Sequence, residues 1–162
     1  MSTHTASQTA TAEPAHVLHV LTDPMACARW APIEFSTDQA SGEYLHTGSR
    51  TTLQGRIAGR NVTFEIDVLA ADERGLSLRA TGPVGLEVDY QLTPSDCGTL
   101  IEAYITLAQA GGVTGALASR ATHAILGAGA LRFALRAIAA EAEQLQQAAG
   151  HELASAPKRR AA

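Results

Sequence analysis

The feature that most constrains this chain is a change in the period of its hydrophobic pattern. From about residue 48 to residue 107, apolar and polar residues alternate with a period of two, which is typical of antiparallel strands with one covered face and one face in water. The clearest run has Val62, Phe64, Ile66 and Val68 on one face and Thr63, Glu65 and Asp67 on the other. After Gly111-Gly112 the apolar residues recur every three or four positions, which predicts one long amphipathic helix over 113–148. A sheet of this kind followed by a long helix is an α+β fold.

The stretch before these strands predicts two short helices and leaves one segment open. Residues 3–11, rich in Thr and Ser, are compatible with a polar strand or with a loose tail. Pro14 opens a first helix, and Asp23, as an N-cap before Pro24, opens a second. Strands are predicted at 33–37, 48–58, 62–71, 76–81, 86–92 and 101–107. Because Gly150 is a typical helix stop, we predict a single domain over 1–150 and a disordered tail over 151–162.

Composition argues against several classes of function. A chain of 162 residues that is 46% hydrophobic and 17% charged is typical of one globular domain. Its formal net charge of −4 argues against nucleic acid as the main partner, because phosphate binding needs clustered Lys and Arg. The apolar runs are shorter than the roughly 18 residues of a transmembrane helix, so no membrane span is predicted.

The cysteine and glycine patterns predict no metal site and no cofactor. Cys27 and Cys97 have neither CxxC spacing nor a histidine cluster nearby. The segment Gly111–Gly115 lacks the GxGxxG spacing of a dinucleotide-binding turn. Unclustered thiols suit a reducing compartment, and residues 1–15 lack the pattern of a secretion signal. We therefore predict a cytoplasmic protein, and we leave its oligomeric state open.

Several short motifs resemble those of a known family. The segment Ala12–Pro24, followed by Trp30, is similar to the opening A-P-x-x-V-(x)-x-L-T-D…W signature of the START-like helix-grip superfamily. This superfamily is also called SRPBCC, or polyketide cyclase/dehydrase and lipid-transport proteins. The motifs that follow in the family's order are Gly82-Pro83, Leu92-Thr93-Pro94, Gly98-Thr99 and the terminal helix. The resemblance covers about residues 3–148.

The resemblance implies a curved antiparallel β-sheet gripping a long C-terminal α-helix, with two short helices after the first strand. It also implies an elongated cavity between sheet and helix, in which members of the superfamily bind lipids, sterols, quinones or polyketides. The alternation puts the ionisable residues on the outer face and brings the hydroxyl of Tyr90 to the apolar wall, with Ser49 and Thr51 adding two more if their strand keeps register. The residues that we predict to bind a ligand are Trp30, Phe35, Phe64, Ile66, Leu78, Val88, Tyr90, Ile105, Leu117, Ala124, Leu131 and Leu135.

Two interpretations remain open for several candidate residues. Trp30 and Phe35 either cover the cavity mouth or belong to the core. Tyr90 either orients a ligand or is an ordinary core tyrosine with a satisfied hydroxyl. Arg132 and Arg136, four residues apart, either form a solvated flank or hold a carboxylate at the end of the cavity.

Three hypotheses of function follow. The leading one is binding or carriage of a hydrophobic small molecule, such as a lipid, a quinone or a polyketide-like compound. The alternative is a polyketide cyclase, aromatase or dehydratase, in which Tyr90, His123 or Arg132 would have to supply proton transfer or oxyanion support. The third is an interaction module that binds a protein partner through an exposed face. That face would carry Arg79, Glu102 and Tyr104. No catalytic residue is assigned, and whether the chain is an enzyme stays open.

Overall fold

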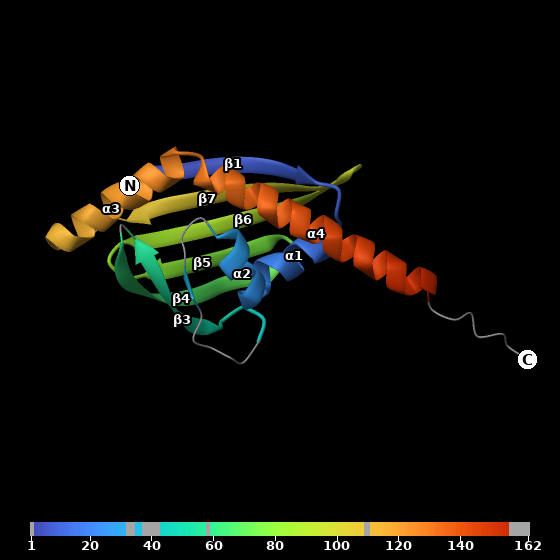
Figure 1. The fold of residues 1–162 in the computed structure, drawn as a ribbon, viewed down its shortest axis with the longest axis horizontal. Helices are drawn as coiled ribbons and strands as arrows, with labels where there is room; N and C mark the ends of the chain where they lie inside the picture. The colour runs from blue at the N-terminus through green and yellow to red at the C-terminus, as the bar shows by residue number, and fades with distance from the viewer. Residues whose placement is uncertain (1, 32–34, 37–42, 58, 109–110, 156–162) are drawn as a thin grey trace, which may run out of the picture.

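One curved antiparallel sheet and four helices make up the described part of the chain (Figure 1). The computed structural model describes residues 2–31, 35–36, 43–57, 59–108 and 111–155. Within these residues the sheet has seven strands in the order β1-β7-β6-β5-β4-β3-β2. The strands are β1 (Ser2–Ala10), β2 (Phe35–Ser36), β3 (Arg50–Ile57), β4 (Arg60–Asp72), β5 (Gly75–Thr81), β6 (Gly85–Ser95) and β7 (Gly98–Ala108). The helices are α1 (Pro14–Thr22), α2 (Pro24–Trp30), α3 (Gly112–Gly127) and α4 (Ala130–Ser155).

The antiparallel meander from β3 to β7 confirms the prediction made from the alternating pattern. Leu53 pairs with Phe64, Leu78 pairs with Val88, and Val88 pairs in turn with Ile105. Directly paired residues point to the same face of a sheet. The apolar half of each strand therefore collects on the concave face, which is the face that the helices cover.

The polar N-terminal segment is a strand rather than a loose tail. β1 pairs with β7 continuously from Ser2↔Leu107 to Ala10↔Thr99. Thr-rich sequence is compatible with a strand, and at the edge of the sheet β7 supplies backbone hydrogen-bond partners that composition does not reveal. The buried hydroxyl of Thr99 also donates to the carbonyl of Ala12 at 2.7 Å, which anchors the chain directly after β1.

The single helix predicted over 113–148 is wrong, because the chain forms two helices there. α3 and α4 are bent by 59° relative to each other, and Gly129 between them has a φ of 93°, a left-handed conformation that favours glycine. The predicted stop at Gly150 is also wrong, since α4 continues to Ser155. The predicted disordered tail is thus corrected for residues 151–155, and residues 156–162 lie outside the described part.

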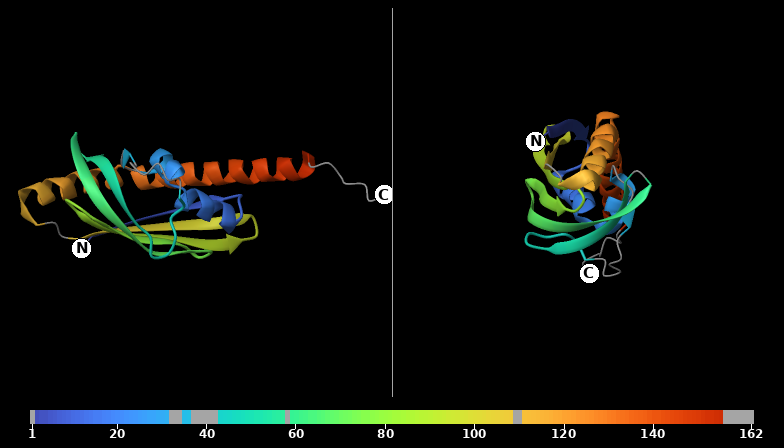
Figure 2. Two further views of the ribbon diagram at one scale, coloured as in Figure 1. Left: turned by 90° about the horizontal axis from the view of Figure 1, so that it is seen from below. Right: turned by 90° about the vertical axis from the view of Figure 1, so that its left-hand side faces the viewer.

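Helix α4 runs along the concave side of the sheet, and α1 and α2 lie beside it (Figure 2). Leu135 and Ile138 on its inner face are fully buried. An ion pair between Arg29 Nε and Glu141 Oε1 at 2.9 Å joins α2 to α4. The sheet and these three helices therefore enclose one hydrophobic core.

The edge of the sheet next to β3 is formed by the short strand β2. Phe35 and Ser36 of the strand predicted over 33–37 form β2, in which Phe35 pairs with Gly55. The other positions of that predicted strand lie outside the described residues. Among the helices described, none is long and apolar enough on its own to cross a membrane. The bent pair Gly115–Gly127 and Ala130–His151 together has the length and the apolar composition of a membrane span.

Candidate functional site

A pocket of about 200 Å³ lies between the concave face of the sheet and helices α1, α2 and α3. The sheet contributes a mainly apolar wall that includes Phe64, Ile66 and Leu76, and the helices add Leu21 and Leu126. An apolar cavity of roughly 150 Å³ is enough to bind benzene. The pocket therefore has room for a small apolar molecule, or for the apolar end of a longer one.

The opening of the pocket is polar. Its exposed lining residues include Glu43, Tyr44, His46 and Arg50. The hydroxyl of Tyr44 lies 3.0 Å from Nε2 of His19 on α1, which ties the opening to the helices. Arg50 Nε donates to Asp67 Oδ1 at 2.6 Å. The charged side chains of the lining thus lie at the solvent-exposed end of the pocket.

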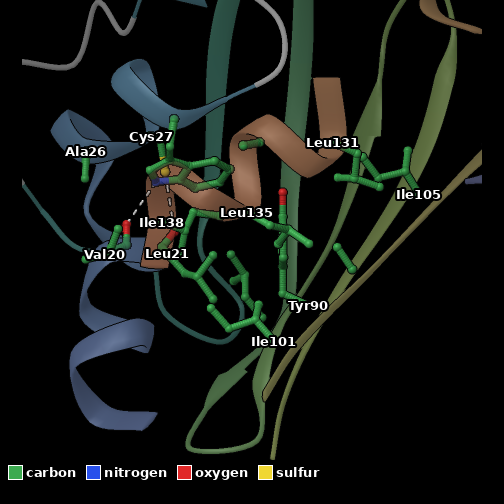
Figure 3. Close-up of a cluster of buried hydrophobic side chains, with 14 of the residues drawn as sticks. Val20, Leu21, Ala26, Cys27, Tyr90, Ile101, Ile105, Leu131, Leu135 and Ile138 are labelled. Atoms are coloured by element: carbon green, nitrogen blue, oxygen red, sulfur yellow. Dashed lines mark hydrogen bonds between the residues drawn. The ribbon is translucent and has the colours of Figure 1, made fainter. Parts of the chain in front are cut away.

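Most polar groups on the buried wall are paired with backbone carbonyls. Trp30 Nε1 donates to the carbonyl of Val20 at 3.2 Å, and Cys27 Sγ donates to the carbonyl of Leu21 at 3.4 Å (Figure 3). Burial, with a smaller effect from nearby carboxylates, raises the pKa of the Cys27 thiol to about 12. The thiol is therefore neutral at physiological pH, and the wall at this point carries no charge.

Tyr90 on β6 differs from these neighbours. Its side chain is 3% exposed, and its ring packs edge-on against Trp30 with the ring centroids 5.7 Å apart. Burial, and to a smaller extent Cys27, raises the pKa of the phenol. Within the described residues its hydroxyl has no hydrogen-bond partner, and its oxygen is open to the pocket rather than fully enclosed. The structure therefore places a neutral hydroxyl without a protein partner on a largely apolar wall.

The structure brings most of the predicted site residues together. Those that line the pocket are Trp30, Phe64, Ile66, Leu78, Val88, Tyr90 and Ile105. Thr51 lines it as well, because Thr51 pairs with Ile66 and shares its face. Whether these residues contact a ligand stays a prediction.

Four of the predicted residues lie elsewhere. Leu131 and Leu135, on the inner face of α4, are buried in the core and do not line the pocket. Leu117 is 60% exposed and Ala124 is also exposed. A single apolar stripe through both helices would turn these two residues inward, but the bend between the helices gives α3 a different inner face. The prediction that Leu117 and Ala124 line the cavity is therefore corrected.

The inner face of α3 is not the one that the sequence predicts. It carries Ala118, Thr122 and Leu126, spaced by four, of which Thr122 and Leu126 line the pocket. The sequence therefore offers two possible inner faces for α3, this one and the one through Leu117 and Ala124. Only a prediction of the break at Gly129 would have distinguished between them. For Phe35 the structure gives the backbone position in β2, so its contact with a ligand stays a prediction.

The remaining candidate side chains do not reach the pocket. His123 Nδ1 on α3 lies 2.9 Å from Nε2 of His4 on β1. Arg132 and Arg136 are exposed and absent from the lining. Arg79 on the outer face pairs with Glu87 at 3.4 Å, and the protein-partner hypothesis for that face stays a prediction.

Metal ligation has no support within the described residues, where no three His, Cys, Asp or Glu side chains form a cluster that could hold an ion. Cys27 is buried and Cys97 is exposed, and both are free thiols. The thiols therefore do not form a bridge with each other.

Solved structures share this fold at low sequence identity. A protein from Chromobacterium violaceum has a TM-score of 0.64 at 14% identity, over 88% of this chain and 99% of that chain. A protein from Thermus thermophilus has a TM-score of 0.63 at 16% identity, over 87% and 97% of the two chains. DynU16, a protein of the dynemicin biosynthetic locus, has a TM-score of 0.55 at 17% identity, over 84% of this chain and 46% of that chain.

The family assignment comes from the sequence as a whole. No curated protein is significantly similar in sequence to this chain. The family model described as polyketide cyclase/dehydrase and lipid transport, in contrast, matches residues 1–143, from the edge strand β1 into the second half of α4. The curved sheet, the long C-terminal helix and the apolar pocket agree with that match. The chain therefore belongs to the polyketide cyclase/dehydrase and lipid-transport family, with the helix-grip fold that this family uses to enclose hydrophobic ligands.

Proposed function

We propose that this chain binds and carries a hydrophobic small molecule, such as a lipid, a quinone or a polyketide-like compound. The observation that best supports the proposal is the distribution of polarity in the pocket. Its buried wall is largely apolar, whereas Glu43, His46 and Arg50 lie at the exposed opening. Such a site favours entry of an apolar group and leaves any polar end near water.

The driving force is transfer of ligand surface out of water. At about 25 cal/mol per Å², burying about 200 Å² of apolar ligand surface contributes about 5 kcal/mol. Loss of translational and rotational freedom on association offsets part of this gain. A gain of about 5 kcal/mol alone corresponds to a dissociation constant of only about 0.2 mM. Shape fit and polar contacts therefore have to add to the apolar transfer.

A cyclase, aromatase or dehydratase acting in the same pocket is the alternative. The family's description and the biosynthetic locus of DynU16 favour it. Of the groups expected to move protons, however, His123 pairs with His4 and Arg132 is exposed, and neither lines the pocket. Tyr90 lines it, but burial raises the pKa of the phenol, so it stays protonated and is a poor base. Carriage is therefore the better-supported function.

Native mass spectrometry of the purified protein, before and after organic extraction, tests the proposal. We expect an extractable mass in the wild type and a reduced amount in Val88→Phe, because the larger ring occupies the pocket that Val88 lines. Val113→Phe is the matched control, since Val113 on α3 is 80% exposed and lies outside the pocket. This control is expected to carry as much ligand as the wild type.

The result that contradicts carriage is equally specific. In that result, the purified wild type contains no extractable ligand and converts a polyketide mimic into product. Tyr90→Phe loses this activity. Such an outcome would make the enzyme the better proposal, with the Tyr90 hydroxyl as its proton donor.

A cytoplasmic location is proposed on chemical grounds. Cys27 and Cys97 are both free thiols, a state that suits a reducing compartment. Fractionation of the native host with an antibody against the chain tests this location.

A further inference from the structure

We propose that the ligand is a neutral molecule whose buried end carries an oxygen, and that this oxygen pairs with the hydroxyl of Tyr90. The inference rests on the proposed function and adds the chemical class of the ligand. It predicts a phenol, ketone, quinone or ether in the pocket, rather than a pure hydrocarbon or a molecule that enters with an ionised group first.

The other buried polar groups of the pocket wall have partners within the protein. Trp30 donates to the carbonyl of Val20, and Cys27 donates to the carbonyl of Leu21. On the opposite side of the pocket, the hydroxyl of Thr122 donates to the carbonyl of Ala118 at 2.8 Å. These groups complete the local structure without a ligand.

The hydroxyl of Tyr90, like that of Thr51, lines the pocket and has no partner in the described part of the chain. Its oxygen is not fully enclosed, because His16 Nδ1 is the one fully buried side-chain polar atom without a partner among the described residues. The Tyr90 oxygen therefore opens into the mainly apolar pocket, where a hydroxyl favours a hydrogen-bond partner. Since Tyr90 lines the pocket, a ligand oxygen is well placed to supply the missing bond. Its side chain is also held in place by the edge-on contact with Trp30, so little freedom remains to be lost on binding.

Charge selects against an ionised inner end. The described lining residues that carry charge are Glu43 and Arg50, and both are exposed at the opening. Cys27 beside Tyr90 is a neutral thiol. A carboxylate or an ammonium group at the depth of Tyr90 would lose its water without meeting an opposite charge there. An ionised group on the ligand is therefore expected at the opening, if it is present at all.

Thr51 provides the competing site for a ligand oxygen. It lines the pocket from β3, is half-buried, and its hydroxyl has no hydrogen bond to another described residue. Tyr90, at 3% exposure, is the more deeply buried of the two. We therefore assign the oxygen to Tyr90 and compare Tyr90→Phe with Thr51→Val, which keeps the side-chain shape. Tyr104→Phe is the matched control, because Tyr104 on β7 does not line the pocket.

The test measures dissociation constants by calorimetry for three probes of similar shape. They are 2-methylnaphthalene, 2-naphthol and 2-naphthoate, at pH 7, with the wild type, Tyr90→Phe, Thr51→Val and Tyr104→Phe. For 2-naphthol we expect Tyr90→Phe to weaken binding about fivefold, which is in the range for one neutral hydrogen bond. The same variant is expected to bind 2-methylnaphthalene as well as the wild type or better. Thr51→Val is expected to weaken 2-naphthol binding less than Tyr90→Phe does, and the control Tyr104→Phe is expected to bind 2-naphthol like the wild type. The wild type is expected to bind 2-naphthoate at least tenfold more weakly than 2-naphthol.

The outcomes separate this inference from the proposed function. If the wild type binds none of the three probes, the proposed function fails. If Tyr90→Phe weakens the binding of 2-naphthol and 2-methylnaphthalene equally, only the assignment of the oxygen to Tyr90 is overturned. The same holds if Thr51→Val, and not Tyr90→Phe, selectively weakens the binding of 2-naphthol. If 2-naphthoate binds as tightly as 2-naphthol, the requirement for a neutral ligand is overturned. Thermal melts of each variant confirm that the proteins compared are folded.

Discussion

Ionisation of the Cys27 thiol predicts a loss of stability at alkaline pH that can be measured directly. Burial raises the pKa of this thiol in the folded protein from an ordinary value of 9.0 to about 12. Above pH 9 the unfolded chain releases the proton while the folded protein keeps it, so the free energy of unfolding falls as the pH rises. The stabilising contribution is complete below pH 9 and is lost progressively between pH 9 and about pH 12.

The magnitude follows from the size of the shift. One pH unit above the pKa of the unfolded thiol, the folded state has lost about 1.4 kcal/mol relative to the unfolded state. The assay is urea unfolding of the wild type and Cys27→Ala at pH 8 and at pH 10. Deleting the sulfur carries a packing cost that does not depend on pH. The stability difference between the two proteins is therefore expected to shrink by about 1.4 kcal/mol over this range.

Cys97→Ala is the control for this experiment, because Cys97 is exposed. This variant keeps the Cys27 thiol, so it is expected to lose stability between pH 8 and pH 10 as the wild type does. Parallel curves for the wild type and Cys27→Ala would refute the reasoning. They would mean that the folded thiol ionises at its ordinary pKa, and hence that water reaches this wall of the pocket.

Three further predictions concern stability. Gly98→Ala is expected to lower the melting temperature strongly in a thermal scan, because Gly98 has a φ of 142° and a Cβ there would lie 2.1 Å from the carbonyl oxygen of Ala10. Ile138→Ala is expected to lower the free energy of unfolding in urea by about 2–5 kcal/mol, since Ile138 is fully buried. Leu117→Ala, at a side chain 60% exposed, is expected to change it by no more than about 0.5 kcal/mol. Equal losses in the two variants would contradict the burial of α4. Thr99→Val is expected to cost about 1–3 kcal/mol, because the carbonyl of Ala12 would lose its buried partner, and an unchanged unfolding midpoint would count against that hydrogen bond.

The sheet is predictable from the sequence because its two faces differ in chemistry. The run from Val62 to Val68 and the run from Leu86 to Leu92 alternate without interruption, and one face of each is buried against the helices. The apolar pocket wall follows from the same alternation, which is why the prediction that Phe64, Ile66 and Val88 line the cavity agrees with the structure.

The helical side of the site is harder to predict. The apolar residues of 113–148 keep their spacing of three and four across Gly129, so the hydrophobic pattern gives no sign of a break. The change of direction comes with the left-handed conformation of that glycine, and a glycine can also be accommodated within a continuous helix, so its presence alone does not predict the break. Because α3 runs in a different direction from the predicted single helix, different residues of 112–127 face inward. The prediction that Leu117 lines the cavity is wrong for this reason.

The opening of the pocket is not predictable either. Glu43, Tyr44 and His46 lie in a stretch without regular secondary structure, so no periodicity indicates which way their side chains point. Tyr44 reaches the opening through its contact with His19, which lies 25 positions earlier in the chain. Contacts of this kind depend on how the segments pack in three dimensions.

The position of Trp30 makes intrinsic fluorescence a suitable readout of ligand binding. It is the sole tryptophan of the sequence, and it forms part of the pocket wall beside Tyr90. Its intrinsic fluorescence is therefore expected to change in intensity or wavelength when a molecule fills the pocket. The protein carries its own optical reporter, and a library of non-fluorescent compounds can be screened by titration without attaching a dye.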